Sequence, residues 1–272
     1  MRAIHIFACV VAACVVGKPA LAADESAWSQ DSRAAIRLVA GANTGTDASL
    51  RAGVEVTLQP GWKTYWRYPG DSGVPPRFDF SGSTNLKSAH VLYPAPHLFI
   101  DDGEKTLGYK GQVIFPLRVT PAQADKPVTV RLKIDYAVCE KLCIPAEGRA
   151  ELTLQHATSS HDGALAAAEA LVPKPVSAEE IGLTARRVNS APKPLIDVEL
   201  KSSEPVEVFV EGPTAEWALP IPTPAQGAPA GTRAFGFELD GLPPGVDPKG
   251  QFELTFTIVG GGRALEAKTR LD

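Results

Sequence analysis

The chain has 272 residues, of which 31 are acidic and 27 are basic, so its formal net charge is −4 at pH 7. This mild acidity argues against nucleic acid and anionic membranes as partners, because both attract basic proteins. The 24 glycines and 24 prolines are typical of a chain with many short strands and turns and few long helices.

Residues 1–22 are predicted to be an export signal that is cleaved off. Arg2 supplies a short basic region, the apolar run AIHIFACVVAACVV follows, and residues 20–22 (ALA) fit an A-x-A cleavage site. The run of about 14 apolar residues is too short to span a bilayer as a helix. A lipoprotein-processing site at Cys14, within VAAC, is an alternative that stays open.

Export determines how the remaining cysteines are interpreted. The mature chain would carry a net charge of −6 and two cysteines, Cys139 and Cys143. An even number of cysteines in an oxidising compartment suggests that they can pair. No later stretch is long and apolar enough for a transmembrane helix, so we expect a soluble mature protein.

Three segments of the first half alternate apolar and polar residues with the period of a β-strand. They are 53–58 (GVEVTL), 112–119 (QVIFPLRV) and 127–138 (PVTVRLKIDYAV). Turn clusters such as 69–76 (PGDSGVPP) separate the strands. This pattern predicts an antiparallel β-sandwich, which we expect to form a first domain over residues 24–160.

A short helix and a linker are predicted to follow this domain. Residues 161–173 (HDGALAAAEALVP) combine good helix formers with Asp162 as the predicted cap and Pro173 at the end. Strand patterns then resume and end in a predicted hairpin around residues 260–262 (GGG). We therefore expect an all-β fold, with a second sandwich domain over residues 175–272 that contains no cysteine.

The two cysteines lie four positions apart, after the clearest strand pattern. In an extended strand their Cα atoms would be ~13 Å apart, whereas a disulfide needs ~4.4–6.8 Å. Pro145 and the flanking strand pattern argue against a helix. We expect the first strand to end at Val138 and the next to cover residues 149–154 (RAELTL), with both cysteines near the surface at the hairpin end.

From the residues alone, three interpretations of the pair stay open. A structural bridge of this size would contribute roughly 2 kcal/mol, against ~4.7 kcal/mol for a loop of a hundred residues. A copper or zinc site needs further ligands, and none of the histidines has ligand spacing to the cysteines; they are His90, His97, His156 and His161. A redox switch fits the short ring and Lys141 between the thiols, because a nearby ammonium favours the reactive thiolate.

Three blocks of sequence, together with the strand that leads into Cys139, carry a resemblance to a known family. They are 58–80 (LQPGWKTYWRYPGDSGVPPRFDF), 93–121 (YPAPHLFIDDGEKTLGYKGQVIFPLRVTP) and 138–147 (VCEKLCIPAE). In their order and spacing, over roughly residues 35–155, they resemble the N-terminal periplasmic domain of the thiol:disulfide interchange protein DsbD. The similarity is closer to its relative ScsB.

This resemblance implies an immunoglobulin-like fold in the periplasm and a protein-disulfide reductase type of activity without a bound cofactor. Cys139 and Cys143 would be catalytic, relaying electrons from a membrane-embedded thiol reductase to periplasmic thioredoxin-fold proteins. By analogy with the family, Cys143 would attack and Cys139 would resolve. The alternatives are an interaction module with a structural disulfide, and a copper- or zinc-handling protein.

The resemblance also predicts residues around the sulfurs. A cap loop with an aromatic residue matches residues 96–104 (PHLFIDDGE), so Phe99 is the predicted cap, with His97 and Leu98 beside it. Trp66 matches an aromatic near the family's site. The chain departs from DsbD in the closer spacing of its cysteines and in lacking a membrane domain and a terminal thioredoxin domain. For the second sandwich we expect a scaffold or docking role.

Overall fold

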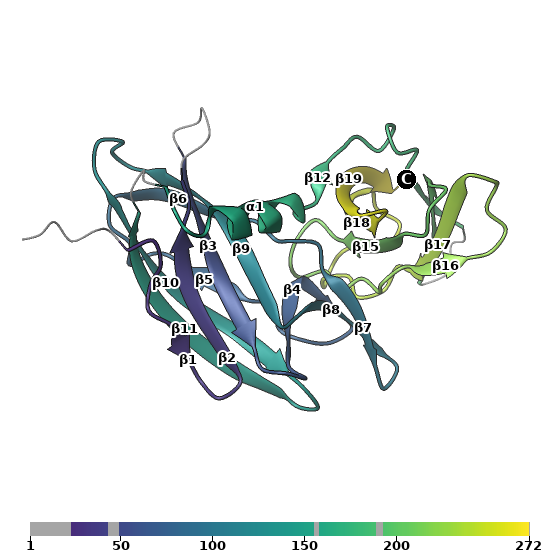
Figure 1. Cartoon of the computed structure of the whole chain (residues 1–272). Helices are drawn as coiled ribbons and strands as arrows, with labels where there is room; N and C mark the ends of the chain where they lie inside the picture. The colour runs from purple at the N-terminus through teal and green to yellow at the C-terminus, as the bar shows by residue number, and fades with distance from the viewer. Residues whose placement is uncertain (1–22, 43–48, 155–157, 189–192, 272) are drawn as a thin grey trace, which may run out of the picture.

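The structure is a computed structural model that describes residues 23–42, 49–154, 158–188 and 193–271. The predicted export signal at residues 1–22, with Cys14, lies outside the described residues, as does His156. Strands dominate the described part, and several antiparallel sheets confirm the all-β prediction (Figure 1). Within these ranges no helix has the length and apolar character needed to cross a membrane.

The N-terminal lobe consists of two sheets in which every pair of neighbouring strands is antiparallel. In the first sheet the order is β1 (Ser29–Gln30), β2 (Ala34–Ala40), β3 (Leu50–Leu58), β9 (Gln112–Pro121) and β6 (Leu86–Val91). In the second it is β11 (Cys143–Leu154), β10 (Val128–Cys139), β4 (Lys63–Gly70), β8 (Glu104–Lys110) and β7 (His97–Asp101), with β5 (Arg77–Asp79) paired to β10. The three segments predicted from alternation fall in β3, β9 and β10, so these predictions are confirmed.

One apolar core joins the two sheets of this lobe. Alternate residues of each strand supply it, for example Val54 and Phe115 from the first sheet and Leu132 and Ile134 from the second. The same alternation leaves the charged residues of β10 on the outer face, where Arg131 pairs with Glu151. The core therefore determines which side chains of each strand point inward and which face away from the core.

The predicted helix is present as α1 (Asp162–Ala170), which packs on the first sheet through the buried Leu165. The prediction that Asp162 caps it is wrong, because the cap position is His161 and Asp162 lies in the first turn. The Asp162 carboxylate instead accepts a hydrogen bond from the Ala42 amide and pairs with Arg51. This side chain therefore ties the helix to the sheet.

The C-terminal lobe also contains two sheets. One has the order β12 (Lys174–Pro175), β19 (Arg263–Leu271), β18 (Phe252–Gly260) and β15 (Glu207–Glu211); the other has the order β13 (Thr184–Arg187), β14 (Leu195–Lys201), β17 (Thr232–Glu238) and β16 (Thr223–Ala225). Apart from the short parallel pair β12–β19, all neighbouring strands are antiparallel. A second apolar core, separate from the first, fills this lobe. The hairpin predicted around residues 260–262 is confirmed by β18 and β19.

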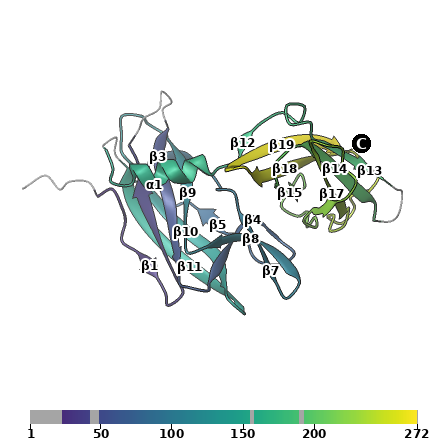
Figure 2. The same ribbon diagram turned by 45° about the vertical axis from the view of Figure 1, so that its right-hand side comes forward.

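The two lobes meet along β4 (Figure 2). Trp66 is fully buried there, and its ring lies 6.1 Å from that of Phe209 in β15. The Arg67 guanidinium pairs with Glu211 at 2.7 Å and with Glu266 at 2.5 Å. A single strand of the N-terminal lobe thus carries an apolar contact and an ionic contact to the C-terminal lobe.

Candidate redox site

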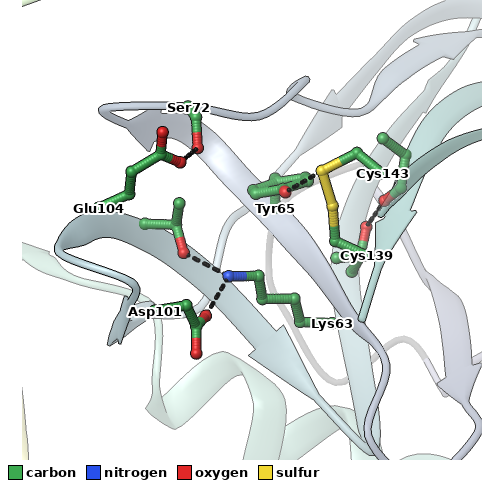
Figure 3. The surroundings of a disulfide bond; sticks show 10 residues. Lys63, Tyr65, Ser72, Asp101, Glu104, Cys139 and Cys143 are labelled. Atoms are coloured by element: carbon green, nitrogen blue, oxygen red, sulfur yellow. Dashed lines mark hydrogen bonds and ion pairs between the residues drawn. A yellow bond between two sulfur atoms is a disulfide. The ribbon is translucent and has the colours of Figure 1, made fainter. Parts of the chain in front are cut away.

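The tip of the β10–β11 hairpin holds the only disulfide among the described residues. The two strands pair without interruption from Val128↔Leu154 to Cys139↔Cys143. Cys139 and Cys143 are bonded to each other, with their Cα atoms 4.2 Å apart (Figure 3). The predicted turn is confirmed, although β11 begins at Cys143 itself rather than near residue 149.

The two sulfurs lie in different environments. Cys139 is 4% exposed and lies between β11 and β4, because it pairs with Cys143 on one side and with Lys63 on the other. Cys143 begins the edge strand β11 and is exposed. Of the two residues, Cys143 is therefore the one exposed to solvent, whereas Cys139 is shielded by the sheet.

Tyr65 of β4 contacts the exposed cysteine through its hydroxyl group. Its hydroxyl lies 3.0 Å from the Cys143 Sγ and must be the donor, since a disulfide sulfur carries no hydrogen. Burial and the carboxylates of Glu104 and Asp101 raise the pKa of Tyr65, so the hydroxyl keeps its proton at neutral pH. The site therefore contains a fixed neutral donor aimed at one sulfur.

A glycine accounts for the fixed position of the Tyr65 ring. Gly73 has a φ of +120°, and a Cβ at this position would lie 2.4 Å from the Tyr65 Cε1. The backbone of the turn thus packs directly on the ring, which only glycine permits. In the same turn, Ser72 donates a 2.8 Å hydrogen bond to the Glu104 carboxylate.

A buried lysine lies on the same strand, two positions before Tyr65, and lines the same pocket. The Lys63 Nζ donates hydrogen bonds to the Asp101 Oδ2 at 2.7 Å and to the Thr106 Oγ1 at 2.8 Å (Figure 3). Only 8% of the Lys63 side chain is exposed, against 57% for Asp101. The hydrogen bond and the charge of Lys63 lower the pKa of Asp101, so this carboxyl group stays ionised.

The β7–β8 hairpin forms one wall of a pocket of about 680 Å³ that contains both cysteines. Its turn has positive φ at Asp102 and Gly103, and its tip contributes Ile100, Asp101 and Glu104 to the pocket lining. Ile100 is 64% exposed, and Leu142 in the cysteine turn is 72% exposed. Apolar side chains therefore face solvent on two sides of the disulfide.

The structure places the predicted cap residues in this hairpin but outside the described lining of the pocket. Phe99 lies behind Lys63 and Lys110, whose Nζ atoms are 5.6 Å and 4.5 Å from its ring centre. His97 packs on Phe99, and Leu98 packs against the core of the lobe. Ile100 and Asp101, the next two residues, occupy the position beside the cysteines.

Trp66, which was predicted to lie near the sulfurs, faces away from them. Successive side chains of a strand point to opposite faces, so Tyr65 faces Cys143 while Trp66 enters the core. Sequence reasoning assigned no role to Tyr65 or Lys63. The sequence did indicate that these two residues share one face of the strand, because they lie two positions apart.

A copper or zinc site at the cysteines would need further ligands from the described part of the chain. No group of three or more His, Cys, Asp or Glu side chains in those ranges is arranged to hold an ion. The two sulfurs are bonded to each other, which leaves neither as a thiolate ligand.

The stretch of chain that contains both cysteines matches a known protein family. Residues 33–155 match the family described as "Thiol:disulfide interchange protein DsbD, N-terminal", which confirms the resemblance over this part of the chain. The crystal structure of the N-terminal periplasmic domain of ScsB from Proteus mirabilis has a similar fold, with a TM-score of 0.71 and 22% identity. The similarity covers 91% of this chain and 98% of that one. No curated protein matches.

Proposed function

We propose that this protein exchanges disulfides in the periplasm through the Cys139–Cys143 pair. The observation that carries the proposal is the unequal exposure of the two cysteine residues, which line one pocket. The match of residues 33–155 to the DsbD N-terminal family supports it. In this proposal residues 24–160 form an immunoglobulin-like redox domain, and residues 175–272 form a second sandwich domain that acts as a scaffold or docking surface.

The exchange begins at Cys143. A partner thiolate attacks the Cys143 Sγ, a bond forms between the two proteins, and the Cys139–Cys143 bond breaks with its electron pair going to the Cys139 sulfur. A second thiolate of the partner then attacks the partner's own sulfur in the mixed disulfide and releases Cys143. The partner is oxidised and the pair is reduced by two electrons, and the Tyr65 hydroxyl can donate to the departing Cys143 thiolate.

The reverse sequence passes the electrons on. The Cys143 thiolate attacks a client disulfide, and the Cys139 thiolate then attacks the Cys143 Sγ and releases the reduced client. The partners in this proposal are a membrane-embedded thiol reductase and periplasmic thioredoxin-fold proteins. Leu142 and Ile100 offer them apolar contact area beside the sulfur. No bound cofactor takes part.

Trapping of mixed disulfides tests the proposal. A Cys139→Ala protein keeps the exposed thiol but lacks the resolving one, so it should accumulate a mixed disulfide with a thioredoxin-fold partner, seen as a reductant-sensitive band on a denaturing gel. Cys143→Ala should trap much less, because Cys139 is buried. The double variant is the control. If neither single variant traps a partner, the proposed exchange is wrong.

The reduction potential separates this function from a permanent bridge. Structural disulfides of secreted proteins have potentials below about −300 mV, whereas working exchangers are more oxidising. We expect a value above about −300 mV for this pair by equilibration with glutathione. A lower value would favour an interaction module whose disulfide stays closed.

A further inference from the structure

The buried ammonium of Lys63 is the feature of the pocket that the exchange steps above do not use. Lys63 is directly opposite Cys139 in the β4–β10 ladder. Side chains of directly opposed residues share one face, with Cα atoms about 4.5–5.5 Å apart. Both residues line the same pocket. Burying a lysine is costly unless its charge serves an interaction, and its observed partner Asp101 is largely solvent-exposed.

The chemistry of the pair creates a negative charge next to this lysine. When the disulfide opens, the electron pair stays on Cys139, which is 4% exposed. Burial disfavours a thiolate. Most charged groups around it also do so, since Asp101, Asp102 and Glu104 line the pocket from the β7–β8 hairpin and Glu140 from the turn.

Two cations line the same pocket and oppose these carboxylates: Lys63 from β4 and Lys141 from the turn. Lys141 is exposed, so water screens its charge. Lys63 is buried, and its charge acts through a medium of lower dielectric constant. The neutral Tyr65 hydroxyl on the same strand contacts Cys143 rather than Cys139. Lys63 is therefore the group best placed to offset a charge on Cys139.

We propose that Lys63 is the cation that stabilises the Cys139 thiolate when the disulfide opens, and that Asp101 holds this cation while the disulfide is closed. In the closed form the sulfurs carry no charge and the ammonium pairs with Asp101 and Thr106. In the open form the thiolate competes with the Asp101 carboxylate for the same ammonium, which sits on a flexible stem. Lys63 thus acts through Cys139: its ammonium would stabilise the Cys139 thiolate both when the disulfide is reduced and when it forms again.

Two substitutions that should change the acid dissociation constant of Cys139 in opposite directions test this role. In the full chain carrying Cys143→Ser, the pKa of Cys139 is measured from thiolate absorbance as the pH is raised. Lys63→Met keeps the length of the side chain and removes its charge, so the acid dissociation constant of Cys139 should fall at least tenfold. Asp101→Asn frees the ammonium and removes a nearby negative charge, so that constant should rise.

Further controls separate charge from shape. Lys63→Arg keeps the charge and should leave the pKa of Cys139 closer to the original value than Lys63→Met does. Removing Lys63 leaves Asp101 in contact with water, so Lys63→Met should still fold. In the protein with both cysteines, Lys63→Met should slow the opening of the disulfide by dithiothreitol, and Asp101→Asn should speed it.

The outcomes distinguish this inference from the proposed function on which it rests. If Lys63 only held the β7–β8 hairpin in place, breaking its ion pair from either side would shift the pKa of Cys139 in the same direction. That result, or no shift in Lys63→Met, would overturn the role of Lys63. Neither the absorbance titration nor the reaction with dithiothreitol involves a protein partner, so both are independent of whether a partner is trapped in the exchange test.

Discussion

The two lobes each contain a long antiparallel hairpin, and the two hairpins close in different ways. β18 and β19 pair continuously up to Gly260↔Arg263, and their two-residue turn uses Gly261 and Gly262 at φ +58° and +72°. Turns of this kind match the twist of the strands. β10 and β11 pair just as continuously but end in the turn Glu140–Leu142, which contains no residue with positive φ and is flanked by the disulfide.

The comparison shows that closing a hairpin in this fold does not require a covalent bond. A glycine turn, a continuous ladder and core side chains close β18–β19 without a disulfide. The cross-strand ladder and the core side chains of β10 hold β10–β11 along its whole length. A ring of this size adds only about 2 kcal/mol by chain entropy. We therefore expect the ladder to stay intact when the disulfide opens, as the proposed exchange requires.

Of the changes that test this contrast between the hairpins, removing the sulfurs should have the largest effect on exchange activity. We expect Cys139→Ser with Cys143→Ser to abolish exchange completely while lowering the free energy of unfolding by no more than about 2 kcal/mol. Insulin reduction in the presence of a reductant measures the first quantity, and denaturant titration of the variant against the oxidised original protein measures the second. A variant that cannot fold would show that the bridge is structural, and the contrast between the hairpins would fail.

Removing the hydrogen bond to the exposed sulfur should have an intermediate effect. Tyr65→Phe deletes the hydroxyl that lies 3.0 Å from the Cys143 Sγ. A hydrogen bond contributes about 0.5–1.5 kcal/mol, so exchange should slow by roughly twofold to tenfold. The matched control is Tyr68→Phe in the same strand, whose hydroxyl donates to the Leu219 carbonyl at the lobe junction. Equal slowing in both variants would contradict a specific role for Tyr65.

Changing the glycine turn should leave exchange unaffected. Alanine at Gly261 or Gly262 has to adopt a left-handed conformation, which costs about 1–2 kcal/mol per residue. We expect each variant to lower the melting temperature, while the rate of insulin reduction stays at its original value. Gly163→Ala in α1, where a Cβ meets no atom within 4 Å, should have the opposite sign and raise stability. A loss of exchange in Gly261→Ala would show that the second hairpin takes part in the chemistry.

The elements that local pattern determines were predictable from the sequence. The alternation of residues 127–138 identified β10, and the geometry of two cysteines four residues apart identified the turn that follows it. The glycine run at residues 260–262 identified the second hairpin. In each case the residues that set the structure are close together in the chain.

The surroundings of the sulfurs were less predictable, because they depend on the register between distant strands. Lys63 and Cys139 are paired across more than seventy residues of sequence, and nothing local indicates that pairing. The difference between Tyr65 and Trp66 is a single position, and one position in a strand reverses the face that a side chain occupies. A match based on aromatic type does not distinguish the two faces of a strand, and it selected Trp66, which lies in the core.

The place of β4 at the lobe junction also constrains how the protein can be shortened. Phe209 and Ile221 of the C-terminal lobe complete the core of the N-terminal lobe beside Trp66. A fragment that stopped after α1 would uncover this apolar surface and leave Arg67 without its two carboxylates. Such a fragment would be prone to self-association, so a substitute cover for Trp66 would have to be engineered before its redox chemistry could be studied alone.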